Sequence, residues 1–386
     1  MAVVVAGQSP PSSEVSELRD GGQPFLQGNA EFGIHHPTAI HQCESTPKRA
    51  RRGDILISVR APVGALNVAD HAYGIGRGLA AVRPHRETDA RYLWWALHAA
   101  VDRLHAVATG STYPAVRAQD VGSLAIATHP AERQRAIAGY LDRETARIDA
   151  LIEKKERLIA LLDEKEIALL SEELTQRSPR IGRLRFLAVL QTGITMDSGR
   201  EISSDAVTLP YLRVANVQSG WLDLDNIAEV TVPLELAVRA TLRQGDVLMT
   251  EGGDLDKLGR GTLWEGQIPH CLHQNHVFAV RPDPRFLDAG YLALLTRTSQ
   301  ARRYFESTGV KVTNLASTNS DKILNLPVPL LPVDRQRRVV AVCTARVAKI
   351  NGMKRIITRQ IALIHAKRQA LITAAVNGLI PIPGAA

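Results

Sequence analysis

The chain has 386 residues, of which 45% are hydrophobic and 22% are charged, so it is long enough for two or three domains with substantial cores. This composition excludes a mainly disordered protein, and the apolar runs fall short of the roughly 18 residues that a membrane helix needs. Residues 1–6 are too short for a secretion signal, so we expect a cytoplasmic protein with no membrane contact. The net charge of +8 falls almost entirely in residues 334–378, which hold 10 basic residues and 1 acidic residue, so basicity alone is weak support for nucleic-acid binding.

Residues 1–130 alternate short apolar segments with turns rich in glycine and proline, and this pattern predicts a strand-rich domain. Its charges nearly cancel, with 12 basic and 11 acidic residues. Two short segments in it return later in the chain. They are RGDIL at residues 52–56 and AVRP at residues 81–84.

A long helix is predicted from residue 131, directly after Pro130, because no glycine or proline interrupts residues 140–176. Mostly apolar residues recur in it in steps of four and three, which is typical of a coiled coil. These seam positions are Leu141, Thr145, Ile148, Ile152, Lys155, Ile159, Leu162, Glu166 and Leu169. At 1.5 Å per residue, such a helix spans about 65 Å.

Residues 179–333 repeat the first domain. QGDVL at residues 244–248 matches RGDIL, and AVRP recurs at residues 279–282. The offset between matching segments drifts from 192 to 202, so the two halves differ by loop insertions. We therefore predict two pseudo-repeated domains, each followed by a long helix.

The second long helix has a seam at a constant offset of 202 from the first. Its positions are Cys343, Val347, Ile350, Lys354, Ile357, Ile361, Ile364, Arg368 and Leu371. A shared phase without insertion favours an intramolecular coiled coil, although core helices of a bundle are an alternative. Charge supports the pairing, because the first helix has 8 basic and 11 acidic residues, whereas the second is strongly basic. The remaining basic excess would suit DNA backbone or a protein partner.

Several segments resemble the specificity subunits of type I restriction-modification systems. In the first half they are QSPPS at 8–12, QGNAEFG at 27–33 and GDILISVRAPVG at 53–64. The segments that enter the long helices, PAERQRAI at 130–137 and PVDRQRRV at 332–339, also resemble this family. The resemblance covers almost the whole chain. One departure is the N-terminus, which begins abruptly, so we expect the first strand to be incomplete.

The resemblance implies an α+β protein with two strand-rich target-recognition domains joined by two long antiparallel coiled-coil helices. The expected segments are a first target-recognition domain at 1–130, a first long helix at 131–178, a second target-recognition domain at 179–333 and a second long helix at 334–380. It also implies a non-catalytic subunit without a cofactor that reads a bipartite site in double-stranded DNA. Its partners would be two methyltransferase subunits and the translocase-nuclease restriction subunits. With a coil of about 65 Å, the two reading domains would be centred no more than roughly 20 base pairs apart.

Motifs for chemistry are missing from the sequence. We find neither the Asn/Asp-Pro-Pro-Tyr/Phe motif that grips a target adenine nor a phosphate-binding loop of the Gly-x4-Gly-Lys-Ser/Thr type. The glycine-rich residues 73–78 are not followed by a helix pattern and predict a turn between strands. Pro282-Asp283 lacks the following Glu-x-Lys of a nuclease site.

A metal site is not expected either. His270 and His273 would lie on opposite faces of a half-exposed strand, so they are poor candidates for zinc ligands. The three cysteines, Cys43, Cys271 and Cys343, lie far apart without paired spacing, and we expect all three to be reduced.

Base recognition needs side chains that pair with groove edges, chiefly Arg with guanine and Asn or Gln with adenine. Loops should supply them. In the first domain the candidates are Asn29, Arg60, Arg77, Ser111, Thr112 and Tyr113; in the second they are Arg213, Asn216, Arg260, Asn275, Lys311 and Asn314. For each one, a solvated surface residue or a turn former is the competing interpretation.

Two other function classes compete with this one. A coiled-coil adaptor that binds only proteins would keep the helices, but it would not need duplicated domains with polar, variable loops. A single-chain methyltransferase would need the motifs that are missing.

Overall fold

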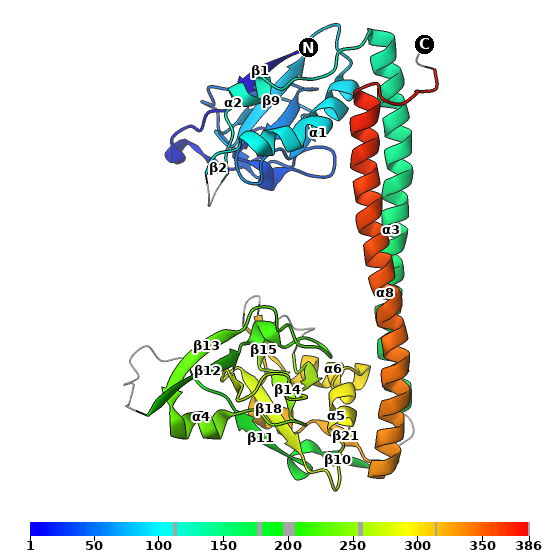
Figure 1. Ribbon diagram of the computed structural model, residues 1–386. Coiled ribbons are helices and arrows are strands. Elements are labelled where there is room, and N and C mark those ends of the chain that lie inside the picture. Colours follow the sequence, from blue (N-terminus) through cyan, green and yellow to red (C-terminus); the bar gives the residue numbers. More distant parts are fainter. Residues whose placement is uncertain (111–113, 176–179, 196–204, 254–257, 313–314, 385–386) are drawn as a thin grey trace. The chain divides into compact units, whose positions relative to one another are not determined.

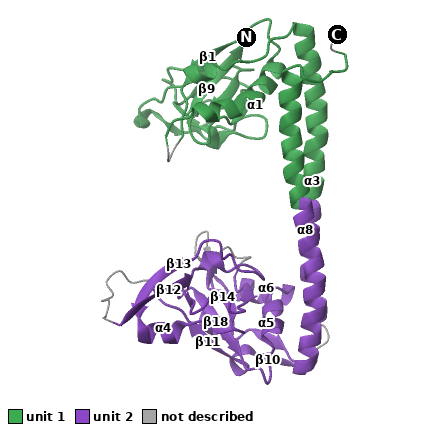
Figure 2. Cartoon of the chain, viewed as in Figure 1, with its two compact units in different colours: residues 1–155, 358–386 green, residues 156–357 purple. Residues whose placement is uncertain are grey.

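The computed structural model describes the whole chain except residues 111–113, 176–179, 196–204, 254–257, 313–314 and 385–386 (Figure 1). The chain divides into two compact units (Figure 2). Unit 1 comprises residues 1–155 and 358–386, and unit 2 comprises residues 156–357. Helices and sheets are both abundant, so the predicted α+β class is confirmed.

Unit 1 contains two sheets. The first is antiparallel, in the order β1 (Ala2–Ala6), β9 (Leu79–Pro84), β6 (Ile55–Ser58), β7 (Leu66–Val68). The second has the order β2 (Ser16–Glu17), β4 (His41–Gln42), β3 (Pro24–Leu26), β8 (Tyr73–Ile75), β5 (Arg49–Ala50), with β3 and β8 parallel. The helices of this domain are α1 (Ala90–Val107) and α2 (Ala118–Gly122), and its 3-10 turns are η1 (Ser12–Glu14) and η2 (Asn29–Glu31).

Unit 2 repeats this arrangement. Its main sheet has the order β11 (Ala188–Thr192), β18 (Val277–Pro282), β14 (Val247–Thr250), β16 (Gly261–Leu263). A second sheet has the order β13 (Ala228–Pro233), β12 (Ala206–Leu212), β17 (Leu272–His273). A third has the order β15 (Gly252–Gly253), β20 (Leu315–Ser317), β19 (Val310–Val312), and β10 (Ile181–Arg183) pairs with β21 (Pro327–Pro329). Its helices are α4 (Leu234–Ala240), α5 (Ala289–Leu295), α6 (Ser299–Thr308) and α7 (Ser320–Leu324), and its 3-10 turns are η3 (Leu184–Phe186) and η4 (Val214–Asn216). The parallel pair β3–β8 recurs as β12–β17.

The central strands explain why the repeated segments are continuously apolar. In β6, Ile55 and Ile57 pack into one core cluster, whereas Leu56 packs into another on the opposite face of the sheet. In β14, Val247 and Leu248 likewise enter two different clusters. Because both faces of each strand are covered, alternate polar residues would be buried without partners.

Two long helices, α3 (Ala131–Thr175) and α8 (Val333–Val376), follow the strand-rich segments. In both units their segments run antiparallel. In unit 1 Lys155 bonds Gln360 and Arg368 bonds Asp149. In unit 2 Lys354 bonds Asp163 and Arg346 bonds Glu173, so in each unit the partner's number in α8 falls as the number in α3 rises. The predicted seam is confirmed, since every one of its 18 positions is buried or half-buried.

Candidate nucleic-acid interface

One corner of each unit brings together loops from its two main sheets. We define the first corner as residues 27–28, 59–60 and 76–78. Residues 76–78 join β8 to β9 and form the predicted turn between strands, whereas residues 73–75 of that predicted turn form strand β8. At Gly78 an added Cβ would lie 2.9 Å from the carbonyl oxygen of Gln27, so only glycine permits this close packing of the two sheets.

We define the second corner as residues 213, 251–252 and 274–276 of unit 2. Its backbone is held as in the first corner. The amide of Val59 donates to the carbonyl of Gly78 at 2.9 Å, and that of Glu251 donates to His276 at 2.9 Å.

Three further backbone hydrogen bonds are equivalent in the two units. In unit 1 they run from Val116 N to Val59 O, from Gly76 N to Leu26 O and from Gln8 N to Ile75 O. The equivalent bonds of unit 2, in the same order, run from Thr318 N to Glu251 O, from Gln274 N to Leu212 O and from Ile194 N to His273 O. The two corners therefore share a framework of the same hydrogen bonds but carry different side chains.

Three predicted residues lie at or beside the first corner. Arg60 and Arg77 are exposed, and Asn29 is half-buried in η2. Among the described residues, none accepts a hydrogen bond from either guanidinium, so both are available to an outside acceptor. Asn29 also lines a hollow of about 560 Å³ beside this corner, together with Glu31 and His41.

The second corner contains two predicted residues. Arg213 is exposed at the N-terminus of η4, and Asn275 is half-buried in the loop between β17 and β18. Asn275 occupies the position of Arg77, because each follows by two residues the last residue of the parallel strand β8 or β17. The structure thus brings an arginine in one unit and an asparagine in the other to the same backbone site.

Asn216 corrects the predicted set. It is only 4% exposed, and its Oδ1 accepts from the amide of Arg213 at 2.8 Å. Its Nδ2 donates to the carbonyls of Asp223 and Asn226. Because the amide is occupied within the protein, Asn216 stabilises the 3-10 turn and is not free to pair with a base.

The remaining candidates lie away from the residues that define the two corners or outside the described residues. Arg260 is half-buried next to β16 and has an interaction within the protein. The backbone of Lys311 belongs to β19. Ser111, Thr112, Tyr113 and Asn314 lie outside the described residues. Thr109 pairs with Ala115 on either side of residues 111–113, where unit 2 has the β19–β20 hairpin.

The second corner also holds a hydrogen-bonded pair of side chains that the sequence did not reveal. Nδ1 of His276 lies 2.5 Å from Oε2 of Glu251. The repeat was the available signal, since RGDILISV and QGDVLMTE align Val59 with Glu251, an apolar residue with a charged one.

The histidine-containing segment before β18 differs from its prediction. His270 is not in a strand but in a turn, with φ of 53°. His273 is fully buried rather than half-exposed, with its Nδ1 2.6 Å from the carbonyl oxygen of Val277. Burial lowers the pKa of His273 and favours its neutral ring. Within the described part of the chain, no group of three or more His, Cys, Asp or Glu side chains could hold a metal ion.

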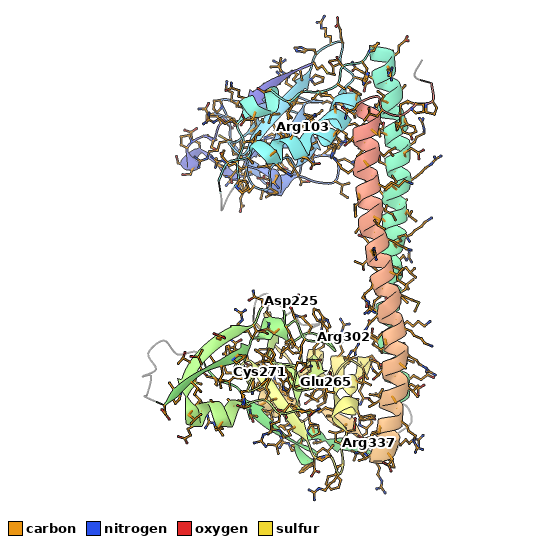
Figure 3. All side chains as sticks on the ribbon, viewed as in Figure 1. Arg103, Asp225, Glu265, Cys271, Arg302 and Arg337 are labelled. Carbon is orange, nitrogen blue, oxygen red and sulfur yellow. The ribbon has the colours of Figure 1, made fainter. Side chains whose placement is uncertain are left out.

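All three cysteines are free and buried. Cys271 lies in the strand-rich part of unit 2 (Figure 3). Burial raises its pKa to about 12 and that of Cys343 to about 11, so neither is an activated thiolate.

Among the helices that the structure describes, none is long and apolar enough to cross a membrane.

Comparison with known proteins identifies relatives of this chain. Residues 5–160 match the family model of the type I restriction modification DNA specificity domain. The "Putative type I restriction enzyme MjaX specificity subunit" of Methanocaldococcus jannaschii is 38% identical over 155 residues, 40% of this chain and 35% of the relative. The type I restriction enzyme MjaIX specificity subunit of the same organism is 23% identical over 247 residues, 56% of each protein. The chain thus matches 35% and 56% of the length of these relatives.

A solved structure has the same fold. It is described as "Structural basis underlying complex assembly and conformational transition of the type I R-M system", and one of its chains aligns over 96% of this chain and 99% of its own length. The TM-score is 0.70 at 17% sequence identity, which establishes similarity of fold.

Proposed function

We propose that this chain belongs to the family of type I restriction-modification specificity subunits, that it reads a split site in double-stranded DNA and that it is not itself an enzyme. The observation that carries the proposal is the pair of corners with one backbone framework and different side chains. A shared framework suits two units that dock on duplex DNA in the same way, while different side chains suit two unlike half-sites.

Base reading is assigned to the side chains that the corners present. In the first corner these are Arg60 and Arg77, whose guanidinium groups suit guanine. In the second corner Asn275 suits adenine, and the exposed Arg213 suits a phosphate. The candidates Ser111, Thr112, Tyr113, Lys311 and Asn314 remain part of the proposal, because in the sequence they follow the matching pairs Thr109-Gly110 and Thr308-Gly309 of the two halves.

The domain boundaries belong to the same proposal. Residues 1–130 and 179–333 would be the target-recognition domains, and residues 131–178 and 334–380 would be the helices that link them. The near-neutral charge of both domains suits modest DNA affinity alone, with phosphate contacts shared by partner subunits.

The partners in the proposal are two methyltransferase subunits and the restriction subunits. Apolar side chains on the long helices support a protein partner. Within unit 2, α3 exposes Leu158 and Leu161, and α8 exposes Met353 and Ile356. Large exposed apolar side chains that recur on helices are typical of surfaces that pack against another protein. The complex would work in the cytoplasm, where it meets DNA.

The test is a methylation map. The chain is expressed with its cognate modification subunit in a host without DNA methylation, and N6-methyladenine is located by sequencing. A split motif with two unlike halves is the expected result. A soluble complex of both proteins without any adenine motif would instead favour the alternative, an adaptor that binds only proteins.

A further inference from the structure

The Glu251–His276 pair of the second corner has no counterpart in the first. The positions equivalent to Glu251 and His276 hold Val59, which is 7% exposed, and Gly78. Unit 1 therefore forms the same backbone framework with an apolar side chain at one of these places and no side chain at the other. The Glu251–His276 pair is not needed to build the corner, and two polar side chains have been added where none is required.

The carboxylate of this pair is a hydrogen-bond acceptor toward the outside. A carboxylate only accepts hydrogen bonds, and Nδ1 of His276 lies 2.5 Å from Oε2 of Glu251, where it can orient the carboxylate. The side chains are 29% and 53% exposed, so an outside donor can reach them. In the major groove the donors are the amino groups on N4 of cytosine and N6 of adenine.

The first corner has the opposite polarity. Arg60 and Arg77 only donate hydrogen bonds, so they suit the acceptors O6 and N7 of guanine. A carboxylate at a DNA surface is repelled by phosphates and is tolerated where it gains a donor from a base edge. The arginines of the first corner therefore need hydrogen-bond acceptors on the base edge, whereas Glu251 of the second corner needs a donor.

We propose that Glu251, positioned by His276, is a specificity-determining residue that accepts a hydrogen bond from the amino group of cytosine or adenine in the second half-site. This inference rests on the proposed function. It adds an identified residue and a chemical class of base edge to that function.

The first test is the methylation map of Glu251→Gln with the modification subunit present. The amide keeps the shape of the side chain but replaces one acceptor oxygen with a donor. We expect the preference for an amino-bearing base to fall about tenfold or more at one position of one half-site, with the other half unchanged. Glu265→Gln is the matched control, since Glu265 is an exposed carboxylate after β16 of the same unit (Figure 3) and lies outside the corner.

His276 provides the second test, which also decides the matter if Glu251→Gln does not fold. His276→Gln keeps an N–H group that can orient the carboxylate, whereas His276→Ala does not. We expect the motif to be retained in the first variant and relaxed in the second. A purely structural pair would lower the melting temperature of His276→Ala and leave its motif intact.

The outcomes separate the inference from the function on which it rests. A wild-type map without a split motif removes the proposed function. A split motif that stays the same in Glu251→Gln overturns the role of Glu251 but leaves the proposed function in place. If Glu251→Gln does not fold, a motif that stays the same in both His276 variants has the same meaning.

Discussion

At the scale of single residues, the repeated segments mark positions that hold each unit together. In unit 1 the carboxylate of Asp54 accepts from both Nε and Nη2 of Arg83. In unit 2 Asp246 and Arg281 form the same bidentate pair. Gln134 and Gln336 also correspond. The side-chain oxygen of Gln134 accepts from the backbone amide of Asp89, and that of Gln336 accepts from the backbone amide of Asp288; each aspartate directly precedes a helix, α1 or α5. These repeated residues are structural, whereas the corners carry the side chains that differ.

Removing the buried carboxylate of unit 2 should be costly. Asp246 is fully buried and accepts from Arg281 at 2.7 Å and from the amide of Arg243 at 2.8 Å. Asp246→Asn leaves the guanidinium without its counter-ion, so we expect a loss of about 3 to 5 kcal/mol in the free energy of unfolding, measured with urea. Asp283→Asn, which removes the exposed pair with Arg285, should leave the urea midpoint unchanged. Equal effects of the two variants would contradict this assignment.

Two buried tyrosines predict a fall in stability at alkaline pH. Burial raises the pKa of both Tyr92 and Tyr291 to about 12, and their hydroxyls donate to carbonyl oxygens, of Val376 and Leu174 among others. Because the folded pKa lies above the ordinary value of 10, the hydroxyls add stability that is fully present below pH 10 and is lost between pH 10 and about 12.

The measurement is urea denaturation at pH 9 and pH 11. The decline in unfolding free energy should be smaller in Tyr92→Phe and in Tyr291→Phe than in the wild type, since phenylalanine has no proton to lose. The same decline in all three proteins would assign it to other groups.

At the scale of elements, the pairing of α3 with α8 depends on apolar seams and on ion pairs that flank them. Lys354 lies on the seam of α8 and bonds both Asp163 at 2.7 Å and Glu166 at 3.1 Å. Burial lowers the pKa of Lys354, but its bonds to these carboxylates outweigh that effect and the net shift is upward. Its ammonium group therefore stays charged within the seam.

Neighbouring isoleucines of α8 offer a matched test of the seam. Ile357 is 8% exposed, whereas Ile356 is 60% exposed. We expect Ile357→Ala to lower the free energy of unfolding by about 2 to 5 kcal/mol, because it leaves a cavity between the helices. Ile356→Ala should change it by less than about 0.5 kcal/mol in the isolated chain. Urea denaturation, monitored by circular dichroism, measures both. A larger effect at Ile356 would mean that the seam lies on the face of α8 that carries Ile356, which would contradict this assignment.

At the scale of the whole molecule, the proposed function makes the two helices a ruler between half-sites. Inserting one heptad into α3 and one at the matching level of α8 keeps the seam in phase and adds about 10 Å. With about 3.4 Å per base pair, the unspecified gap of the methylated motif should grow by about three base pairs.

The methylation map measures the gap directly. A heptad in α3 alone is the control, because it leaves part of one seam without a partner and should abolish the motif. An unchanged gap in the double insertion would refute the ruler.

The sequence by itself determined the duplication, the α+β class and the two seams, because each depends on a period or a repeat that is written along the chain. Only the tertiary structure decided which polar loop residues are available. Asn216 is occupied by carbonyls that follow it by seven and ten residues, and Glu251 meets a histidine 25 residues away. Loop residues follow no period, and their partners depend on how separate strands are brought together. A candidate chosen by residue type alone can therefore be a turn former, and a residue such as Glu251 can be missed.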